Sequence, residues 1–119
     1  MLHTAEKEYE LRYDFNAYCD YEERFGRPLL MDMQKDGFAA LRALTWAGLA
    51  GEYHMSLREV GKLLEDCTAD GMTAAEIRLE IVRAMNESNF IRRLAERAAE
   101  KNMEQKTENE KAQESSSMS

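Results

Sequence analysis

The sequence has few of the residues from which metal sites, disulfide frameworks and reactive centres are built. Its 119 residues include one proline, two cysteines and two histidines. Cys19 and Cys67 lie far apart and form no Cys-x-x-Cys motif, so a cytosolic chain would keep both as small, reduced, half-buried side chains. His3 and His54 are isolated, and neither zinc spacing nor a calcium-loop pattern occurs. The sequence therefore predicts no metal and no cofactor.

Long apolar runs and an excess of basic charge are also missing. No run approaches the ~20 apolar residues that cross a bilayer, and the charges within residues 1–10 disfavour a secretory signal peptide. The formal net charge is -7, whereas phosphate binding needs a basic surface. We therefore expect neither a membrane nor a nucleic acid as the main partner. The hydrophobic fraction of 44% is enough for one packed domain.

No set of residues forms a recognisable catalytic motif. Glu22 and Glu23 are neighbours on a predicted helix and point apart, whereas paired acid and base carboxylates must converge. The serines have no partnered histidine, and no glycine-rich phosphate loop is present. The sequence predicts a protein that is not an enzyme.

The hydrophobic patterning predicts a mainly α fold. We expect a small domain of four to five helices over residues 1–101, with one short N-terminal β-strand and a disordered polar tail over residues 102–119. The predicted helices are Asn16–Phe25, a short turn at Leu29–Met33, Gly37–Leu49, a helix from Ser56 to about Cys67, and a last helix from Thr73 that either reaches about Met103 or breaks near Asn86.

Capping residues mark where these helices begin and end. Asp14 or Asn16 can cap the first helix, Gly26 suits its left-handed end, and Asp36 can cap the third. Two capping boxes, Ser56-Leu-Arg-Glu59 and Thr73-Ala-Ala-Glu76, open the last two helices. The helix over residues 37–49 is apolar on most of its surface, which predicts that it is central. One of its faces comprises Phe38, Leu41, Leu44, Thr45 and Gly48.

Residues 7–13 alternate strictly between apolar and charged, which is typical of a half-buried strand. Tyr9, Leu11 and Tyr13 share one face. No second good strand follows in residues 14–119, so we expect pairing with another molecule or with a short strand that the pattern does not reveal. An extended arm lying on the helices is the alternative.

Eight methionines point to a surface that adapts to varied apolar partners, although for each methionine alone we favour the alternative that it fills a gap in a small core. The best candidate for an exposed apolar patch lies in the weakly structured connection after the first helix. Together with the strand and the central helix, the candidate partner-binding residues are Leu29, Leu30, Met31, Met33, Trp46, Tyr9, Leu11 and Tyr13.

The last helix has a local excess of arginine, at positions 78, 83, 92, 93 and 97. A solvated face with local ion pairs is the interpretation we favour. The alternatives are an acidic partner helix docking there, or a nucleic-acid footprint.

The order of four segments resembles the tail assembly chaperones of long-tailed bacteriophages and gene transfer agents. The segments are Leu11-Arg-Tyr-Asp-Phe-Asn-Ala17, Tyr21-Glu-Glu-Arg-Phe-Gly26, Leu41-Arg-Ala-Leu-Thr-Trp-Ala-Gly-Leu49 and Ser56-Leu-Arg-Glu-Val-Gly61. The resemblance covers about residues 9–90. Arg58 stands where the family more usually has an acidic residue.

The resemblance implies a small helical protein without enzymatic activity. Such chaperones act in the host cytoplasm, bind the long apolar helices of the tape measure protein, keep it soluble and help recruit tail tube subunits. The alternative is a structural virion component, a connector or tail-completion protein, that adds the strand at Tyr9–Tyr13 to a neighbour's sheet. The same strand could also support self-association.

Overall fold

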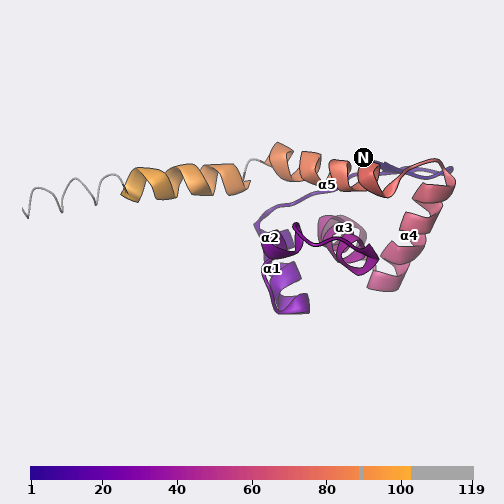
Figure 1. The fold of residues 1–119 in the computed structure, drawn as a ribbon, viewed down its shortest axis with the longest axis horizontal. Coiled ribbons are helices and arrows are strands. Elements are labelled where there is room, and N and C mark those ends of the chain that lie inside the picture. Colours follow the sequence, from indigo (N-terminus) through magenta and orange to yellow (C-terminus); the bar gives the residue numbers. More distant parts are fainter. Residues whose placement is uncertain (89, 103–119) are drawn as a thin grey trace, which may run out of the picture. The chain divides into compact units, whose positions relative to one another are not determined.

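The computed structural model describes residues 1–88 and 90–102 (Figure 1). Residues 1–88 form one compact unit, and residues 89–119 are grouped as a second, in which residues 90–102 are helical. The sequence predicted a single domain ending at residue 101, whereas the compact unit ends at Ser88. The predicted disordered tail lies outside the described residues from position 103 onward.

The mainly α fold is confirmed. The strands are β1 (Leu2–His3) and β2 (Glu8–Tyr9), and the helices are α1 (Phe15–Phe25), α2 (Leu29–Asp32), α3 (Phe38–Tyr53), α4 (Leu57–Ala69) and α5 (Ala74–Ser88). With residues 90–102, the described part of the chain holds six helices, more than the four to five predicted. No helix among the described residues has the length and apolar character to cross a membrane.

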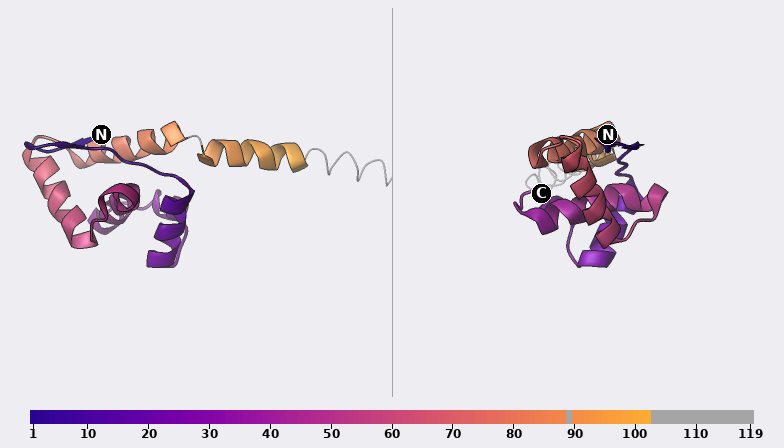
Figure 2. Two further views of the ribbon diagram at one scale, coloured as in Figure 1. Left: turned by 180° about the vertical axis from the view of Figure 1, so that it is seen from behind. Right: turned by 90° about the vertical axis from the view of Figure 1, so that its right-hand side faces the viewer.

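Helix α3 is the centre of the compact unit, as its apolar surface predicted. It contacts α1, α2, α4 and α5, and Figures 1 and 2 show it with these helices around it. Its buried residues are Leu41, Ala43, Leu44, Thr45, Ala47, Gly48 and Leu49. The helix continues to Tyr53, past the predicted end at Leu49.

Most of the predicted helix caps are confirmed. The Asp14 side chain accepts from the Ala17 amide, and Gly26 adopts the left-handed conformation at the end of α1, with φ 71°. Ser56 and Glu59 form a complete capping box, and the Thr73 hydroxyl accepts from the Glu76 amide at 3.1 Å. The prediction that Asp36 caps α3 was wrong, because Gly37 occupies the cap position and no side chain bonds there.

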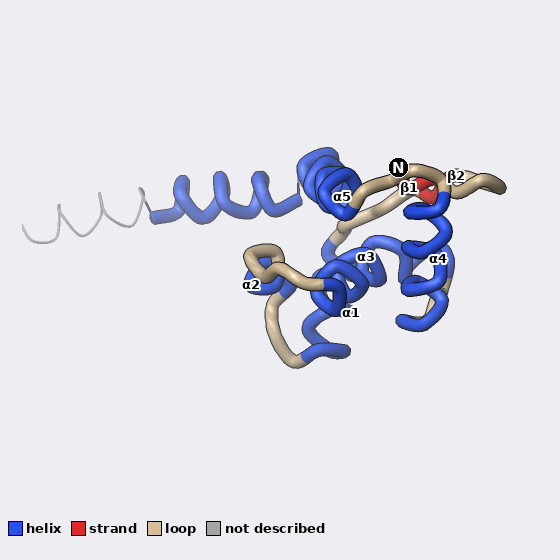
Figure 3. The backbone as a smooth tube through the Cα atoms, turned by 45° about the vertical axis from the view of Figure 1, so that its right-hand side comes forward, coloured by secondary structure: helices blue, strands red, loops and turns tan. Residues whose placement is uncertain are grey.

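The N-terminal strand pairs within its own chain. β1 and β2 are antiparallel, with Leu2 opposite Tyr9 and His3 opposite Glu8 (Figure 3). The partner strand lies upstream of residue 7, whereas the pattern of residues 14–119 offered none, and it is only two residues long. Two residues are too few to produce a period-two pattern, which is why the sequence did not reveal it.

The rest of the predicted strand is an extended arm packed on α3. The Arg12 amide donates to the Gly48 carbonyl at 2.9 Å, and the Tyr13 hydroxyl donates to the Leu44 carbonyl at 2.8 Å. Leu11 and Tyr13 are buried. Burial, reinforced by the nearby Tyr18, raises the pKa of Tyr13 well above its ordinary value, so its hydroxyl stays a neutral donor.

Candidate functional site

An apolar groove runs between α3, α4 and α5. Its volume is about 570 Å³. The residues that line it are Phe38, Ala39, Leu41, Arg42, Gly61, Leu64, Glu65, Thr68, Ala74 and Ile77. Leu41 and Ile77 are buried beneath it, and Leu64 packs partly buried against the same core. The small side chains of Ala39, Gly61 and Ala74 leave the space that larger residues would fill.

Phe38 is the most exposed large apolar residue of the groove, with 85% of its surface accessible. It shares a helix face with Leu41, which is buried. Phe38 is the first residue of α3, directly after Gly37, and the neighbouring helices do not cover this end. A solvated phenylalanine beside an apolar groove is a feature of surfaces that bind apolar partners.

The groove has the composition of a binding surface. Arg42, Glu65 and Thr68 are its only polar side chains, and one carboxylate with one guanidinium does not supply an acid and base pair aimed at a common substrate. Among the described residues, no group of three or more His, Cys, Asp or Glu could hold a metal ion.

The predicted apolar patch at Leu29–Met33 is only partly exposed. Leu29 is buried in the core, with 1% accessible surface, and Met33 packs against the core. Leu30 and Met31 remain exposed, at 46% and 62%. These two side chains form what we call the α2 patch, which lies outside the groove.

The other candidate partner residues serve the interior. Trp46 packs against the core and donates its Nε1 hydrogen to the Met55 carbonyl at 3.0 Å. Tyr9 meets Tyr53 edge-on, with ring centroids 5.3 Å apart. Together with buried Leu11 and Tyr13, these residues attach the N-terminal arm and the helices to one another.

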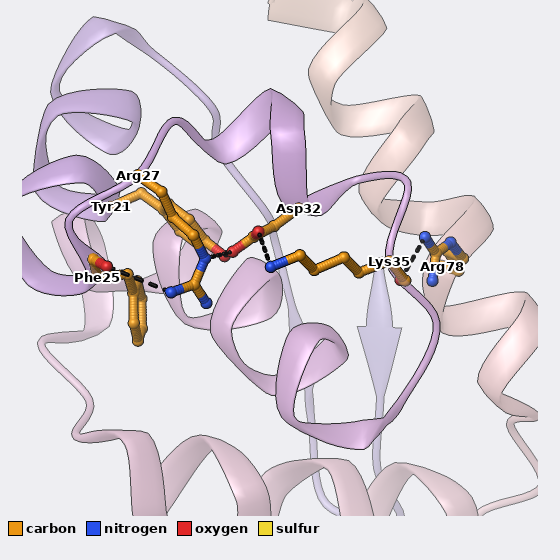
Figure 4. A network of polar contacts seen from close by, with 6 residues as sticks. All are labelled: Tyr21, Phe25, Arg27, Asp32, Lys35 and Arg78. Carbon is orange, nitrogen blue, oxygen red and sulfur yellow. Dashed lines mark hydrogen bonds and ion pairs between the residues drawn. The ribbon is translucent and has the colours of Figure 1, made fainter.

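Asp32 is a fully buried carboxylate that the sequence did not single out. The Asp32 side chain has 0% accessible surface. It accepts hydrogen bonds from the Tyr21 hydroxyl and, at 2.6 Å, from Arg27 Nε, and Lys35 Nζ lies 3.2 Å from its other oxygen (Figure 4).

The same cluster continues to α5. Arg78 donates to the Lys35 carbonyl at 3.0 Å and to the Met33 carbonyl (Figure 4). The segment that leads from α2 to α3 is therefore bonded to α1 through Asp32 and to α5 through Arg78. This positions α3 and its first residue, Phe38, at the mouth of the groove.

The charges around Asp32 decide its protonation state. Burial alone would raise the pKa of Asp32, but the hydrogen bonds from Tyr21, Arg27 and Lys35 outweigh burial and hold the pKa below its ordinary value. Burial and the Asp32 carboxylate together raise the pKa of the Tyr21 hydroxyl. The cluster therefore holds a buried, charged carboxylate that is ion-paired with two side chains nearer the surface.

We expect the substitution Asp32→Asn to lower the free energy of unfolding by about 2–3 kcal/mol, because it removes a buried charge that the buried Tyr21 hydroxyl and the more exposed Arg27 and Lys35 side chains share. Since the pKa of Asp32 is lowered on folding, its contribution is present above the ordinary carboxyl pKa of about 4. It is lost as the pH falls through the lower value of the folded state.

Urea denaturation of the wild type and variant at neutral and acidic pH measures this difference. Asp36→Asn is the matched control, because Asp36 is exposed and should change stability by less than ~0.5 kcal/mol. Equal stability of the two variants at neutral pH would show that Asp32 contributes nothing beyond an exposed carboxylate.

No family model, curated protein or solved structure matches this chain.

Proposed function

We propose that this protein is a tail assembly chaperone of a long-tailed bacteriophage or gene transfer agent. It acts in the host cytoplasm, where it binds the tape measure protein, keeps it soluble and helps recruit tail tube subunits. The observation that carries the proposal is the apolar groove with solvated Phe38 at its mouth. The four-segment resemblance over residues 9–90 supports the choice of cargo.

The groove fits a helix better than an extended peptide. Its walls are helices, and the β1–β2 pair, which is the only sheet among the described residues, lies outside its lining. An amphipathic helix enters such a groove through side chains spaced three and four residues apart. Covering Phe38 fully would contribute about 1.5–3 kcal/mol from apolar burial alone.

The acidic surface suits a carrier of apolar cargo. Residues 1–88 contain ten Lys and Arg against seventeen Asp and Glu, a net charge of -7. Like charges on separate complexes repel one another, so an unassembled cargo covered by several copies resists aggregation. The groove supplies the apolar contact, and the remaining surface supplies the repulsion.

Co-expression with the tape measure protein of the same phage tests the proposal. We expect the soluble yield of the tape measure protein to rise several-fold and the two proteins to co-purify, because the groove covers helices that otherwise aggregate. The Phe38→Glu variant is the matched negative control. An unchanged yield without co-purification would contradict the proposed function.

Mass spectrometry of purified virions separates a chaperone from the structural alternative. A chaperone leaves before the particle is complete, so it should be absent or scarce. A structural subunit would appear at fixed copy number. Strand addition through the whole predicted segment has less support than the groove, because β2 spans only Glu8–Tyr9 and the side chains of Leu11 and Tyr13 are buried against the helices.

A further inference from the structure

Arg42 is the one half-buried arginine among residues 1–88 and 90–102 whose guanidinium has no acceptor within the protein. The other two half-buried arginines are both bonded. Arg27 donates to the Asp32 carboxylate, and Arg78 donates to two backbone carbonyls between α2 and α3. The nitrogen atoms of Arg42 are not sealed from solvent, so water hydrates the guanidinium while the groove is empty.

Arg42 lies where an occupant of the groove would cover it. It belongs to the groove lining, and its stem reaches from α3 to α4, because a Cβ atom built at Gly61 would lie 3.4 Å from Arg42 Cδ. A helix that enters the groove therefore displaces water from the guanidinium. This loss is costly unless the occupant supplies an acceptor in place of the water.

Glu65, the other charged residue of the lining, has less influence on what binds. It is exposed, whereas Arg42 is half-buried, so Glu65 keeps more of its water when the groove is covered. A charge that stays solvated contributes little to affinity, because water and salt screen it. Among the described residues, no ion pair joins Arg42 to Glu65. The acceptor for Arg42 must therefore come from the occupant.

We propose that Arg42 selects a helix that carries a carboxylate at the border of its apolar stripe. This inference rests on the proposed function and names the chemistry of the cargo segment that the groove accepts. A carboxylate can accept two parallel hydrogen bonds from one guanidinium, which fixes the position of the bound helix as well as its charge. A lysine or arginine at the same border would place a like charge beside Arg42 and is rejected. The apolar walls supply affinity, and Arg42 determines specificity.

Two synthetic helical peptides of identical composition test the proposal. Both carry a leucine stripe and equal numbers of Glu and Lys. In one the glutamates border the stripe and the lysines lie on the opposite face, and in the other these places are exchanged. Because the peptides have the same net charge, long-range attraction to the acidic protein is the same for both. Fluorescence anisotropy of the labelled peptides, titrated with the full chain at about 0.15 M salt, measures both dissociation constants. We expect the glutamate-bordered peptide to bind about tenfold more tightly.

Substitutions in the groove assign this preference to Arg42. Arg42→Gln should abolish the preference, and Arg42→Glu should reverse it. Both variants should unfold at the temperature of the wild type, because the Arg42 side chain bonds to nothing in the described chain. Arg58→Gln is the matched control, since it removes the same charge from an exposed position of α4 outside the groove lining, and it should keep the preference. Phe38→Glu should weaken the binding of both peptides.

The outcomes that overturn the proposal are distinct from those that overturn the proposed function. Equal affinity of the wild type for the two peptides, or a preference that survives Arg42→Gln, would contradict selection by Arg42. So would binding of neither peptide. A Glu65→Gln variant that loses the preference as completely as Arg42→Gln would show that the two side chains pair with each other beneath the occupant, which also contradicts it. The soluble yield of the co-expressed tape measure protein is measured separately, so the proposed function stands or falls on its own result.

Discussion

Gly48→Ala should lower the free energy of unfolding by about 2 kcal/mol. A Cβ atom at position 48 would lie 2.7 Å from the ring of Tyr13, closer than two carbon atoms can approach. The Tyr13 ring is buried and bonded to the Leu44 carbonyl, so it cannot move aside without losing that bond. Overpacking of this kind costs about 1–3 kcal/mol, and loss of the hydrogen bond adds about 1 kcal/mol. The better helix propensity of alanine offsets about 1 kcal/mol of this cost.

Gly51→Ala is the control for this substitution. It lies in the same helix, and an added Cβ meets nothing within 4 Å. The same change should therefore stabilise the protein by about 0.5–1 kcal/mol. Thermal unfolding of both variants measures the contrast, which corresponds to a difference in Tm of roughly 10 °C or more. If Gly48→Ala were as stable as Gly51→Ala, the N-terminal arm would not be packed on α3 as described.

Phe38→Glu should reduce the soluble yield of co-expressed tape measure protein to nearly that obtained without the chaperone. Removing the ring forfeits about 1.5–3 kcal/mol of apolar contact, and the carboxylate must be desolvated if cargo still enters. Together these effects weaken binding by at least about 100-fold. Because Phe38 is 85% exposed, the variant should unfold at the same temperature as the wild type.

Met31→Glu separates the two exposed apolar surfaces. Met31 belongs to the α2 patch, which the sequence predicted as a partner-binding surface, and it is 62% exposed. If cargo binds in the groove, this variant should retain most of the soluble yield of the tape measure protein. The opposite pattern, with Met31→Glu inactive and Phe38→Glu active, would move the cargo site to the α2 patch.

Local signals in the sequence predicted the helices well. The capping box at Ser56 and Glu59, the Thr73 cap and the left-handed Gly26 each depend on residues within a few positions of one another. The central position of α3 follows from its apolar surface, which no solvated helix would tolerate. Such features are properties of short segments, so a pattern can reveal them.

The features that define the site depend on contacts between distant segments. Asp32 is buried because Tyr21, Arg27 and Lys35 meet around it, and nothing in the order of residues 29–33 indicates this. Phe38 is exposed because it is the first residue of α3 and the neighbouring helices do not cover this end of the helix. Periodicity marked the residues of the predicted patch and strand as a contact surface, but it cannot decide whether such residues contact the core or the solvent.

Photo-crosslinking from position 38 tests the central claim most directly. A benzophenone amino acid replaces Phe38 in the full chain, with the same replacement at Met31 as the comparison, during co-expression with the tape measure protein. If cargo binds in the groove, we expect a covalent adduct from position 38 that maps to amphipathic helical segments of the tape measure protein. We expect little adduct from position 31. Co-purification of the two proteins without an adduct at position 38 would contradict binding in the groove.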